Sequence, residues 1–300
     1  MADLLPCATF PGMQLKGILE QVTQESGPAF LANDPLSFPR RYATAADREA
    51  AAFLSAALAY GRAAGIRSSL ENLFMRMPEG PAAFIRDFEP QRDGARLAGF
   101  VHRFNTGVDI ALLCRVLRAM TAEAGSLERF FLAGDDPVAP DIGAALTVFS
   151  ARAVELATLL APRQALRTGF RYLFPSPAGG SACKRLCMLL RWLCRPDDGI
   201  DLGLWQAVSP ARLVLPLDTH TARIARLLGL TARCNSDWKM ALEVTASLRR
   251  LDPADPVRFD FALAHLGISE GCTGKKGEIC IPCPVAGMCG VLRTRMKEEG

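Results

Sequence analysis

Half of the 300 residues are apolar and 22% are charged, a composition typical of a globular protein with a sizeable core and not of a disordered chain. No apolar run approaches the length of a membrane-spanning helix, and no basic region followed by a long apolar stretch opens the sequence. We therefore expect a cytoplasmic protein without a membrane partner; its formal net charge of +4 is too small to identify another partner.

The hydrophobic pattern predicts helices along nearly the whole chain. Apolar residues recur at three- and four-residue spacing, and no alternating run is long enough for a substantial sheet. The clearest helices are expected over residues 47–66, 109–120, 141–160, 183–194 and 238–251. Short breaks rich in Pro, Gly and Asp separate these segments. The sequence therefore predicts an all-α protein with roughly ten helices.

Positive charge is concentrated in one part of the chain. Residues 161–250 contain fourteen Lys and Arg but only six Asp and Glu, a net charge of +8, so the remainder carries −4. Such a segment either contacts an anionic partner, with nucleic acid as the first candidate, or forms an ordinary solvated surface.

Four of the ten cysteines lie within the eighteen residues CTGKKGEICIPCPVAGMC. The spacing C-x7-C-x2-C-x5-C allows four thiolates to surround one metal centre, either zinc or a [4Fe–4S] cluster: Cys272, Cys280, Cys283 and Cys289. A disulfide pair is the less favoured alternative in a cytoplasmic chain. Three other cysteines lie at helical spacing on an apolar strip, where we expect them to pack in the core: Cys183, Cys187 and Cys194.

Two further stretches place polar residues or glycines where the chain enters a helix. VLPLDTHTARIARLLGL (214–230) places Asp218 before an amphipathic helix, and AGGSACK (178–184) places a Gly-Gly turn before another. An Asp-Thr-His segment followed by four cysteines resembles the helix-hairpin-helix DNA glycosylase superfamily, in particular the endonuclease III branch with its [4Fe–4S] loop. SACKRLCMLLRW and PLDTHTARIARLLGL also resemble an uncharacterised bacterial family remotely related to those glycosylases.

The resemblance implies an all-α fold of two helical lobes with a C-terminal four-cysteine metal loop. We expect one lobe over residues 50–212, which includes the Gly turn, and the other over 1–49 and 213–300. The loop at 272–289 would hold a [4Fe–4S] cluster, with zinc as the alternative. Its first two cysteines are one residue further apart than in endonuclease III.

In this superfamily a Gly-x-Gly hairpin holds a DNA phosphate with its backbone amides. Gly179, Gly180 and Ser181 match this turn and are the expected DNA contacts, together with Arg185 in the helix that follows. The second hairpin glycine is replaced by Ala182 in this chain.

Two residues match catalytic positions of the superfamily. Lys184 matches a nucleophilic lysine that some members carry shortly after the hairpin; the alternative is a surface lysine on an amphipathic helix. The interval from Lys184 to Asp218 is longer than in endonuclease III, with CRPDDGIDLGLW inserted, and resembles the archaeal 8-oxoguanine glycosylase branch. Asp218 matches the carboxylate that faces the reacting sugar; the alternative is a helix N-cap alone, worth about 1 kcal/mol.

These matches imply chemistry on the deoxyribose. A carboxylate stabilises the positive charge that develops as the N-glycosidic bond breaks, and a neutral amine that attacks C1′ gives a Schiff base that permits β-elimination. The damaged base must first leave the duplex and needs stacking surfaces, for which Tyr60, Trp192 and Trp205 are candidates. His102 and His220 are expected to be structural.

The resulting prediction is a monomeric DNA base-excision repair glycosylase with AP lyase activity. Its partner would be double-stranded DNA with a damaged base, and oxidised purines such as 8-oxoguanine are the favoured substrates on the strength of the Lys184-to-Asp218 interval. The alternative is a non-catalytic iron–sulfur nucleic-acid-binding protein of the same fold, which the altered hairpin favours.

Overall fold

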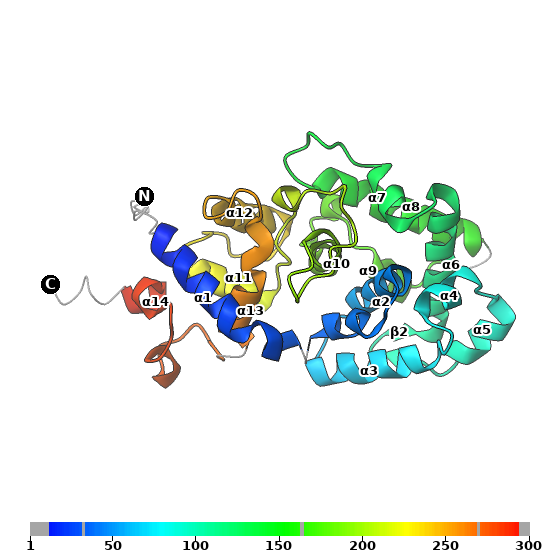
Figure 1. Cartoon of the computed structure of the whole chain (residues 1–300), viewed down its shortest axis with the longest axis horizontal. Helices are drawn as coiled ribbons and strands as arrows, with labels where there is room; N and C mark the ends of the chain where they lie inside the picture. The colour runs from blue at the N-terminus through cyan, green and yellow to red at the C-terminus, as the bar shows by residue number, and fades with distance from the viewer. Residues whose placement is uncertain (1–11, 32–33, 163–164, 269–270, 294–300) are drawn as a thin grey trace.

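The computed structural model describes residues 12–31, 34–162, 165–268 and 271–293, and most of these residues are helical (Figure 1). The strands within these ranges are β1 (Val101–His102) and β2 (Asn105–Thr106), which pair antiparallel as one short hairpin. This confirms the all-α prediction. The helices exceed the predicted ten because several are single turns.

The α-helices in chain order are α1 Gly12–Leu31, α2 Ala45–Ala57, α3 Ala63–Met75, α4 Pro81–Arg86, α5 Pro90–Leu97, α6 Gly107–Ala124, α7 Leu127–Leu132, α8 Gly143–Leu160, α9 Thr168–Leu173, α10 Lys184–Cys194, α11 Thr219–Leu227, α12 Trp238–Arg249, α13 Asp260–Ile268 and α14 Gly290–Arg293. Short 3₁₀ turns lie between them, among them η1 Pro35–Ser37, η2 Pro39–Arg41, η3 Pro177–Gly179 and η5 Pro256–Phe259.

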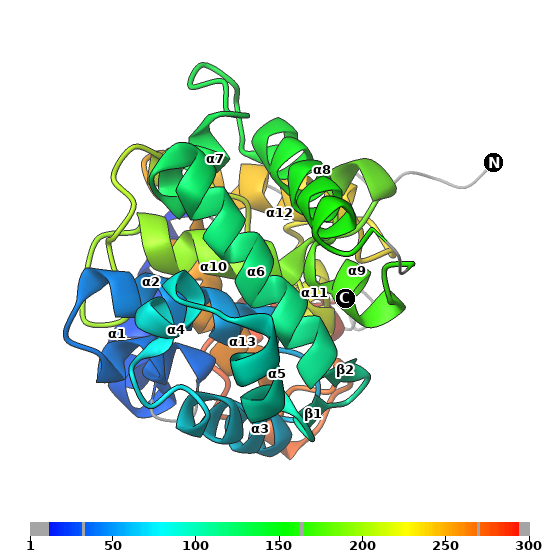
Figure 2. The same ribbon diagram turned by 90° about the vertical axis from the view of Figure 1, so that its right-hand side faces the viewer.

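The helices form two groups along the long axis of the molecule (Figure 1). Helices α2 to α9 form one group, and α1 packs against α13 beside α11, α12 and α14 in the other. Helix α10 lies between the groups and packs against α2, as the end-on view also shows (Figure 2). Buried apolar side chains form one continuous cluster through both groups. The division into lobes at residues 50 and 212 therefore stays a prediction.

The helix predicted over 47–66 is in fact two helices, α2 and α3. The chain between them turns at Gly61, whose φ of 106° disfavours any side chain. The alanines from Ala50 to Ala57 on α2 are almost fully buried, so small side chains allow the close packing of α2 against α10. The interruption brings Tyr60 and Gly61 to the wall of the cleft described below.

Helix α8 is the one helix among the described residues that is long and apolar enough to cross a membrane. Its buried face packs against α6 and α7, and Phe149 lies among aromatic rings: those of Phe53, Phe130, Phe131 and Phe174. These contacts are those of a helix in a protein core.

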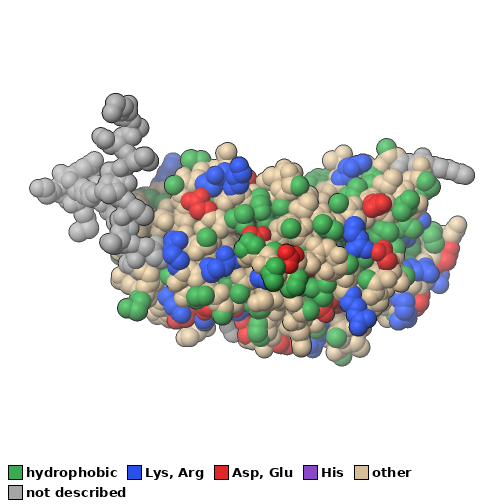
Figure 3. Space-filling model, turned by 90° about the horizontal axis from the view of Figure 1, so that it is seen from above, with side chains coloured by type: hydrophobic (Ala, Val, Ile, Leu, Met, Phe, Trp, Pro, Cys, Tyr) green, Lys and Arg blue, Asp and Glu red, His purple; other side chains and the backbone are tan. Residues whose placement is uncertain are grey.

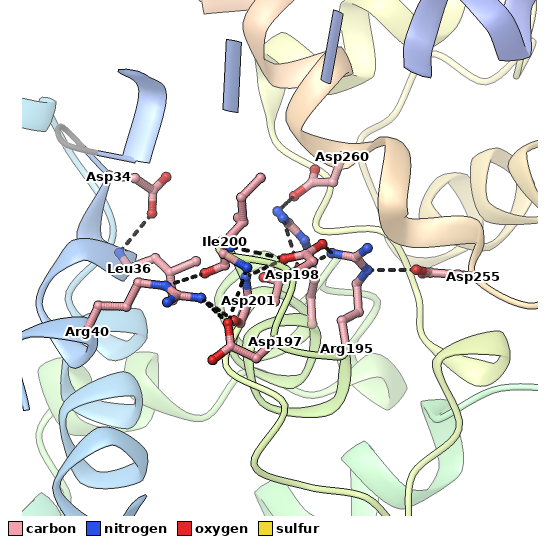
Figure 4. A network of polar contacts seen from close by, with 12 residues as sticks. Asp34, Leu36, Arg40, Arg195, Asp197, Asp198, Ile200, Asp201, Asp255 and Asp260 are labelled. Carbon is pink, nitrogen blue, oxygen red and sulfur yellow. Dashed lines mark hydrogen bonds and ion pairs between the residues drawn. The ribbon is translucent and has the colours of Figure 1, made fainter. Parts of the chain in front are cut away.

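The segment that lengthens the interval between Lys184 and Asp218 is built around buried charge. The Arg191 guanidinium donates to Asp260 Oδ2 at 2.7 Å and to Asp201 Oδ2 at 3.3 Å. Arg195 donates to Asp255 Oδ2 at 2.8 Å and also pairs with Asp201 (Figure 4). Because Asp255 precedes η5 and Asp260 opens α13, these pairs join α10 to the C-terminal group.

The same segment also contacts the N-terminal part of the chain. Arg40 of η2 donates to Ile200 O at 2.9 Å and to Asp197 Oδ1 at 2.7 Å (Figure 4). Helix α10 is thus held at its C-terminal end from both groups, which fixes the direction in which its first residue, Lys184, projects.

Candidate active site

Asp218 is the N-cap of α11. Its Oδ1 accepts hydrogen bonds from the backbone N–H groups of His220 and Thr221, both at 2.9 Å. The predicted capping role is therefore confirmed, and the N-terminus of a helix is a favourable place for a carboxylate. The other oxygen, Oδ2, is not used by the cap and lies 3.9 Å from Lys184 Nζ.

Lys184 is the first residue of α10 and follows a strained backbone position. Cys183 has a φ of 50°, and Arg103 is the only other non-glycine residue with a positive φ in the part of the chain that the structure describes. The turn at Cys183 directs Lys184 into a cleft, where its side chain is 34% exposed. This half-buried position differs from that of the surface lysine considered as the alternative.

The cleft has a volume of about 1370 Å³ and is lined by residues of both helical groups. Besides Lys184 and Asp218, its walls include Asp34, Tyr60, Tyr172 and His220. Its volume exceeds the ~300–1,000 Å³ of a small-molecule pocket. Such a cleft has room for part of a macromolecule.

The predicted Gly turn is present before α10. Gly179 ends η3, and Gly180 has the left-handed conformation, with a φ of 78°. Both glycines are exposed and face open space, while Ser181 lines the cleft. The N–H of Trp238 donates to Gly180 O at 3.2 Å, so part of this turn already contacts the start of α12. Phosphate binding by Gly179, Gly180 and Ser181 stays a prediction.

Arg185 is not placed as a DNA contact requires. The residue is 6% exposed, and its guanidinium donates to Ala57 O at 2.5 Å and to Tyr172 O. The same group lies over the ring of Tyr172, 4.1 Å from the ring centre. Arg185 therefore fastens α10 to the ends of α2 and α9, and its burial argues against the predicted role.

The candidate stacking residues separate into two kinds. Tyr60 lines the cleft, whereas Trp192 and Trp205 are core residues, 1% and 2% exposed, so the suggestion that they stack on a base is wrong. His102 is buried, with its ring nitrogens 2.9 Å from Ser69 Oγ and 3.0 Å from Tyr60 O, and is structural as expected.

The positive charge of residues 161–250 does not form one surface. Several of its arginines are buried or paired with carboxylates: Arg167 with Asp109, Arg191 with Asp201 and Asp260, Arg195 with Asp255, Arg212 with Asp135 and Arg233 with Asp237. Arg163 lies outside the described residues. On the face in Figure 3, Lys and Arg are scattered between apolar patches. Part of the charge excess of this segment is therefore buried or neutralised by carboxylates.

A family model described as a protein of unknown function, DUF2400, matches residues 34–269. The chain belongs to the DUF2400 family. No curated protein and no solved structure matches it. The DUF2400 region begins at Asp34 and includes Lys184, Asp218 and all other residues that line the cleft except Glu25. It ends before the cysteine loop at 272–289.

The cysteine loop beyond the DUF2400 region surrounds a small cavity of about 30 Å³. All four cysteines line this cavity, together with apolar side chains of α11 and α13: Ile224, Leu227, Leu228 and Leu266. Among the described residues, no three His, Cys, Asp or Glu side chains are close enough to hold a single ion. Tetrahedral zinc would need sulfur atoms ~3.8 Å apart, given a Zn–S distance of about 2.3 Å.

The three cysteines predicted to pack in the core of the DUF2400 region are buried. Burial raises the pKa of Cys183 to about 12 and the pKa of Cys187 well above its ordinary value. Cys194 is 6% exposed, and burial raises the pKa of its thiol as well. All three are thus uncharged packing residues, as expected.

Two carboxylates that the sequence did not single out lie near the Lys184–Asp218 pair. Asp34 lines the cleft, and burial raises its pKa; its Oδ1 accepts the N–H of Leu36 at 2.8 Å (Figure 4). Burial raises the pKa of Asp260 to about 6, with Arg191 acting in the opposite direction. The sequence around Asp34 and Asp260 indicates only that each residue caps or opens a helical turn.

Proposed function

We propose that this protein is a DNA base-excision repair glycosylase with AP lyase activity, in which Lys184 is the nucleophile and Asp218 the carboxylate that faces the reacting sugar. The observation that carries the proposal is the 3.9 Å approach of Lys184 Nζ to Asp218 Oδ2 inside an open cleft between two groups of helices. The two residues are far apart in sequence and lie at the first turns of different helices, α10 and α11.

The arrangement supports a relationship to the helix-hairpin-helix glycosylases. A left-handed glycine turn precedes α10, Lys184 opens that helix, and Asp218 caps a second helix across the cleft. These are the parts that the sequence resemblance implied. The insertion between Lys184 and Asp218 does not separate them, because its charged residues fold back onto η2, α10 and Asp255 before η5.

The geometry is suited to both steps of the reaction. As the base departs with the electrons of the N-glycosidic bond, the sugar gains positive charge, which the Asp218 carboxylate stabilises. The amine of Lys184, after passing a proton to a base such as Asp218, attacks C1′. Ring opening gives an imine, and loss of a proton from C2′ then breaks the C3′–O bond and cleaves the strand.

We further propose a [4Fe–4S] cluster held by Cys272, Cys280, Cys283 and Cys289, with zinc as the alternative. All four thiols line one cavity, which supports a single metal centre shared by the four cysteines. The cavity lies against the C-terminal half of α11, whereas Asp218 precedes its first residue. The cluster would therefore hold α11 in place and take no part in the reaction.

The partner proposed is double-stranded DNA with a damaged base, bound by a monomer, and oxidised purines are the favoured substrates. The test is to incubate the protein and sodium borohydride with duplexes carrying 8-oxoguanine, an oxidised pyrimidine or an abasic site. Borohydride reduces the imine, so a covalent protein–DNA adduct is expected on a denaturing gel. Binding to these duplexes without any adduct would favour the non-catalytic nucleic-acid-binding protein instead.

A further inference from the structure

Three aromatic rings pack together at the edge of the cleft. The ring centres of Tyr60 and Phe104 are 5.2 Å apart, those of Tyr60 and Tyr172 are 5.0 Å apart, and those of Phe104 and Tyr172 are 4.8 Å apart. Tyr60 and Tyr172 line the cleft that holds Lys184. Phe104 and Tyr172 are 45% and 42% exposed, which is unusual for rings that a fold could have buried.

This aromatic cluster is rigidly held. The Tyr60 hydroxyl lies 2.5 Å from Asn105 Oδ1 and 3.1 Å from His102 O, and the fully buried Asn105 donates to Gly169 O at 2.8 Å. The hairpin of β1 and β2 carries Phe104 at its tip, beside α3 and α9 (Figure 2). Hydrogen bonds to Asn105 and His102 thus hold the Tyr60 ring, against which the rings of Phe104 and Tyr172 pack.

The backbone at the hairpin tip is strained. Arg103, directly before Phe104, has a φ of 54°, a conformation that side chains other than glycine rarely adopt. The only other described non-glycine residue of this kind is Cys183, directly before Lys184. Strain of this sort is found most often at functional sites. Cys183 thus adjoins Lys184 in the cleft, and Arg103 adjoins Phe104, whose ring packs on Tyr60 and Tyr172 of the cleft wall.

Three arginines flank the aromatic cluster and have no acidic partner within the described ranges. Arg103 precedes Phe104, Arg171 precedes Tyr172, and Arg62 lines the cleft two residues after Tyr60. The other arginine that lines the cleft, Arg185, is buried. Exposed rings bordered by unpaired guanidinium groups match a ligand with flat apolar faces and a regular negative charge.

We propose that Tyr60, Phe104 and Tyr172 form a stacking platform for an unstacked base of a nucleic-acid strand, with Arg62, Arg103 and Arg171 on the adjacent phosphates. This deepens and rests on the proposed function, since a base that leaves the duplex beside Lys184 needs a surface to receive it. Stacking involves no chemical step, so it is testable apart from catalysis.

The experiment compares two fluorescein-labelled single strands of equal length and charge. One carries ordinary bases and the other carries tetrahydrofuran abasic analogues throughout, which lack the C1′ hydroxyl and cannot form an imine with Lys184. Stacking is worth about 1–3 kcal/mol per base, so the wild-type protein should bind the strand with bases on the order of tenfold more tightly. Phe104→Ala should reduce this affinity ratio to about one, because it removes the most exposed ring.

Matched variants separate stacking from other effects. Val108→Ala also removes an exposed apolar side chain near the hairpin, 59% exposed, and should leave the ratio unchanged. Arg171→Gln should weaken the binding of both strands equally. Phe104→Leu, which keeps apolar packing, guards against misfolding of the Ala variant and should also lose the preference, and thermal melting checks each protein.

Two results would overturn the platform: a wild-type ratio near one, or a ratio that survives both Phe104 substitutions. The borohydride test reports on catalysis separately. An adduct together with an affinity ratio near one would support the glycosylase and exclude the stacking platform. A tenfold affinity ratio that depends on Phe104, without any adduct, would support the stacking platform and contradict the glycosylase.

Discussion

Asp218 uses its two carboxylate oxygens for different purposes: Oδ1 caps α11, and Oδ2 lies 3.9 Å from the ammonium nitrogen of Lys184. Capping and facing the lysine are therefore compatible. They are also separable by substitution, because an amide side chain keeps the capping oxygen but not the charge.

Asp218→Asn should reduce the rate of base excision by about 100-fold or more, because the variant lacks the charge that stabilises the sugar cation. Its free energy of unfolding should fall by less than about 1 kcal/mol, since Asn is also a good N-cap. Single-turnover excision and urea unfolding measure the two effects. Asp237→Asn is the control, because Asp237 also caps a helix, α12, through the N–H of Met240 and does not line the cleft. Equal losses of excision rate in both variants would show that Asp218 acts only as a helix cap.

Arg185→Met should destabilise the fold without changing the electrostatics of DNA binding. The substitution leaves the carbonyl oxygens of Ala57 and Tyr172 without their donor, at a cost of about 1–3 kcal/mol each. The slope of log affinity against log salt should stay the same, whereas Arg171→Gln should make it shallower by up to about 0.9. A shallower slope for Arg185→Met would instead indicate that Arg185 contacts DNA.

Protein purified without oxygen should contain about four iron and four sulfide per chain if the cysteine loop holds one cluster. Cys283→Ser should lose most of this content, because Cys283 is one of the four thiols around the cavity. Cys187→Ala, in the buried strip on α10, is the control and should keep it. Stoichiometric zinc in protein produced with ample iron would establish the alternative metal.

Asp260 should make stability depend on pH in an unusual direction. Burial raises its pKa from the ordinary value of 3.8 to about 6, so the folded protein holds this proton more tightly than the unfolded chain. The contribution of Asp260 to stability therefore falls as pH rises from about 4 to about 6 and is constant above that window. The free energy of unfolding of Asp260→Asn, relative to that of wild type, should therefore rise by up to ~3 kcal/mol as the pH rises across this window. Urea unfolding of both proteins from pH 4 to pH 7 measures the difference, and a constant difference would contradict the raised pKa.

Local sequence patterns correctly predicted several helices and the position of Asp218 at a helix start. Apolar spacing located α6, α8, α10 and α12 to within a few residues, and the Pro-Leu-Asp-Thr junction placed Asp218 at the start of α11. The helix predicted over 47–66 failed at Gly61, because Ala and Leu around one glycine read as continuous helix. Glycine inside a helical pattern lowers helix propensity by only about 1 kcal/mol, so its turn was not evident.

The sequence did not predict contacts between residues that lie far apart in the chain. Arg185 and Lys184 are adjacent and both positively charged, yet Arg185 is buried against Ala57 and Tyr172 while Lys184 enters the cleft. Asp34 and the aromatic cluster were missed for the same reason, since only the folded chain brings Phe104 beside Tyr172. The net charge of residues 161–250 likewise counted arginines whose partners, such as Asp135 and Asp255, lie outside that segment.

Covalent trapping of Lys184→Ala tests the central claim most directly. Wild-type protein, Lys184→Ala and the control Lys239→Ala are each incubated with borohydride and a duplex carrying 8-oxoguanine or an abasic site. Lys239 is the second residue of α12 and does not line the cleft. We expect wild type and Lys239→Ala to form the adduct, and Lys184→Ala to form none while it melts normally and binds the duplex within about twofold of wild type. An adduct of undiminished yield with Lys184→Ala would contradict the assignment of Lys184 as the nucleophile.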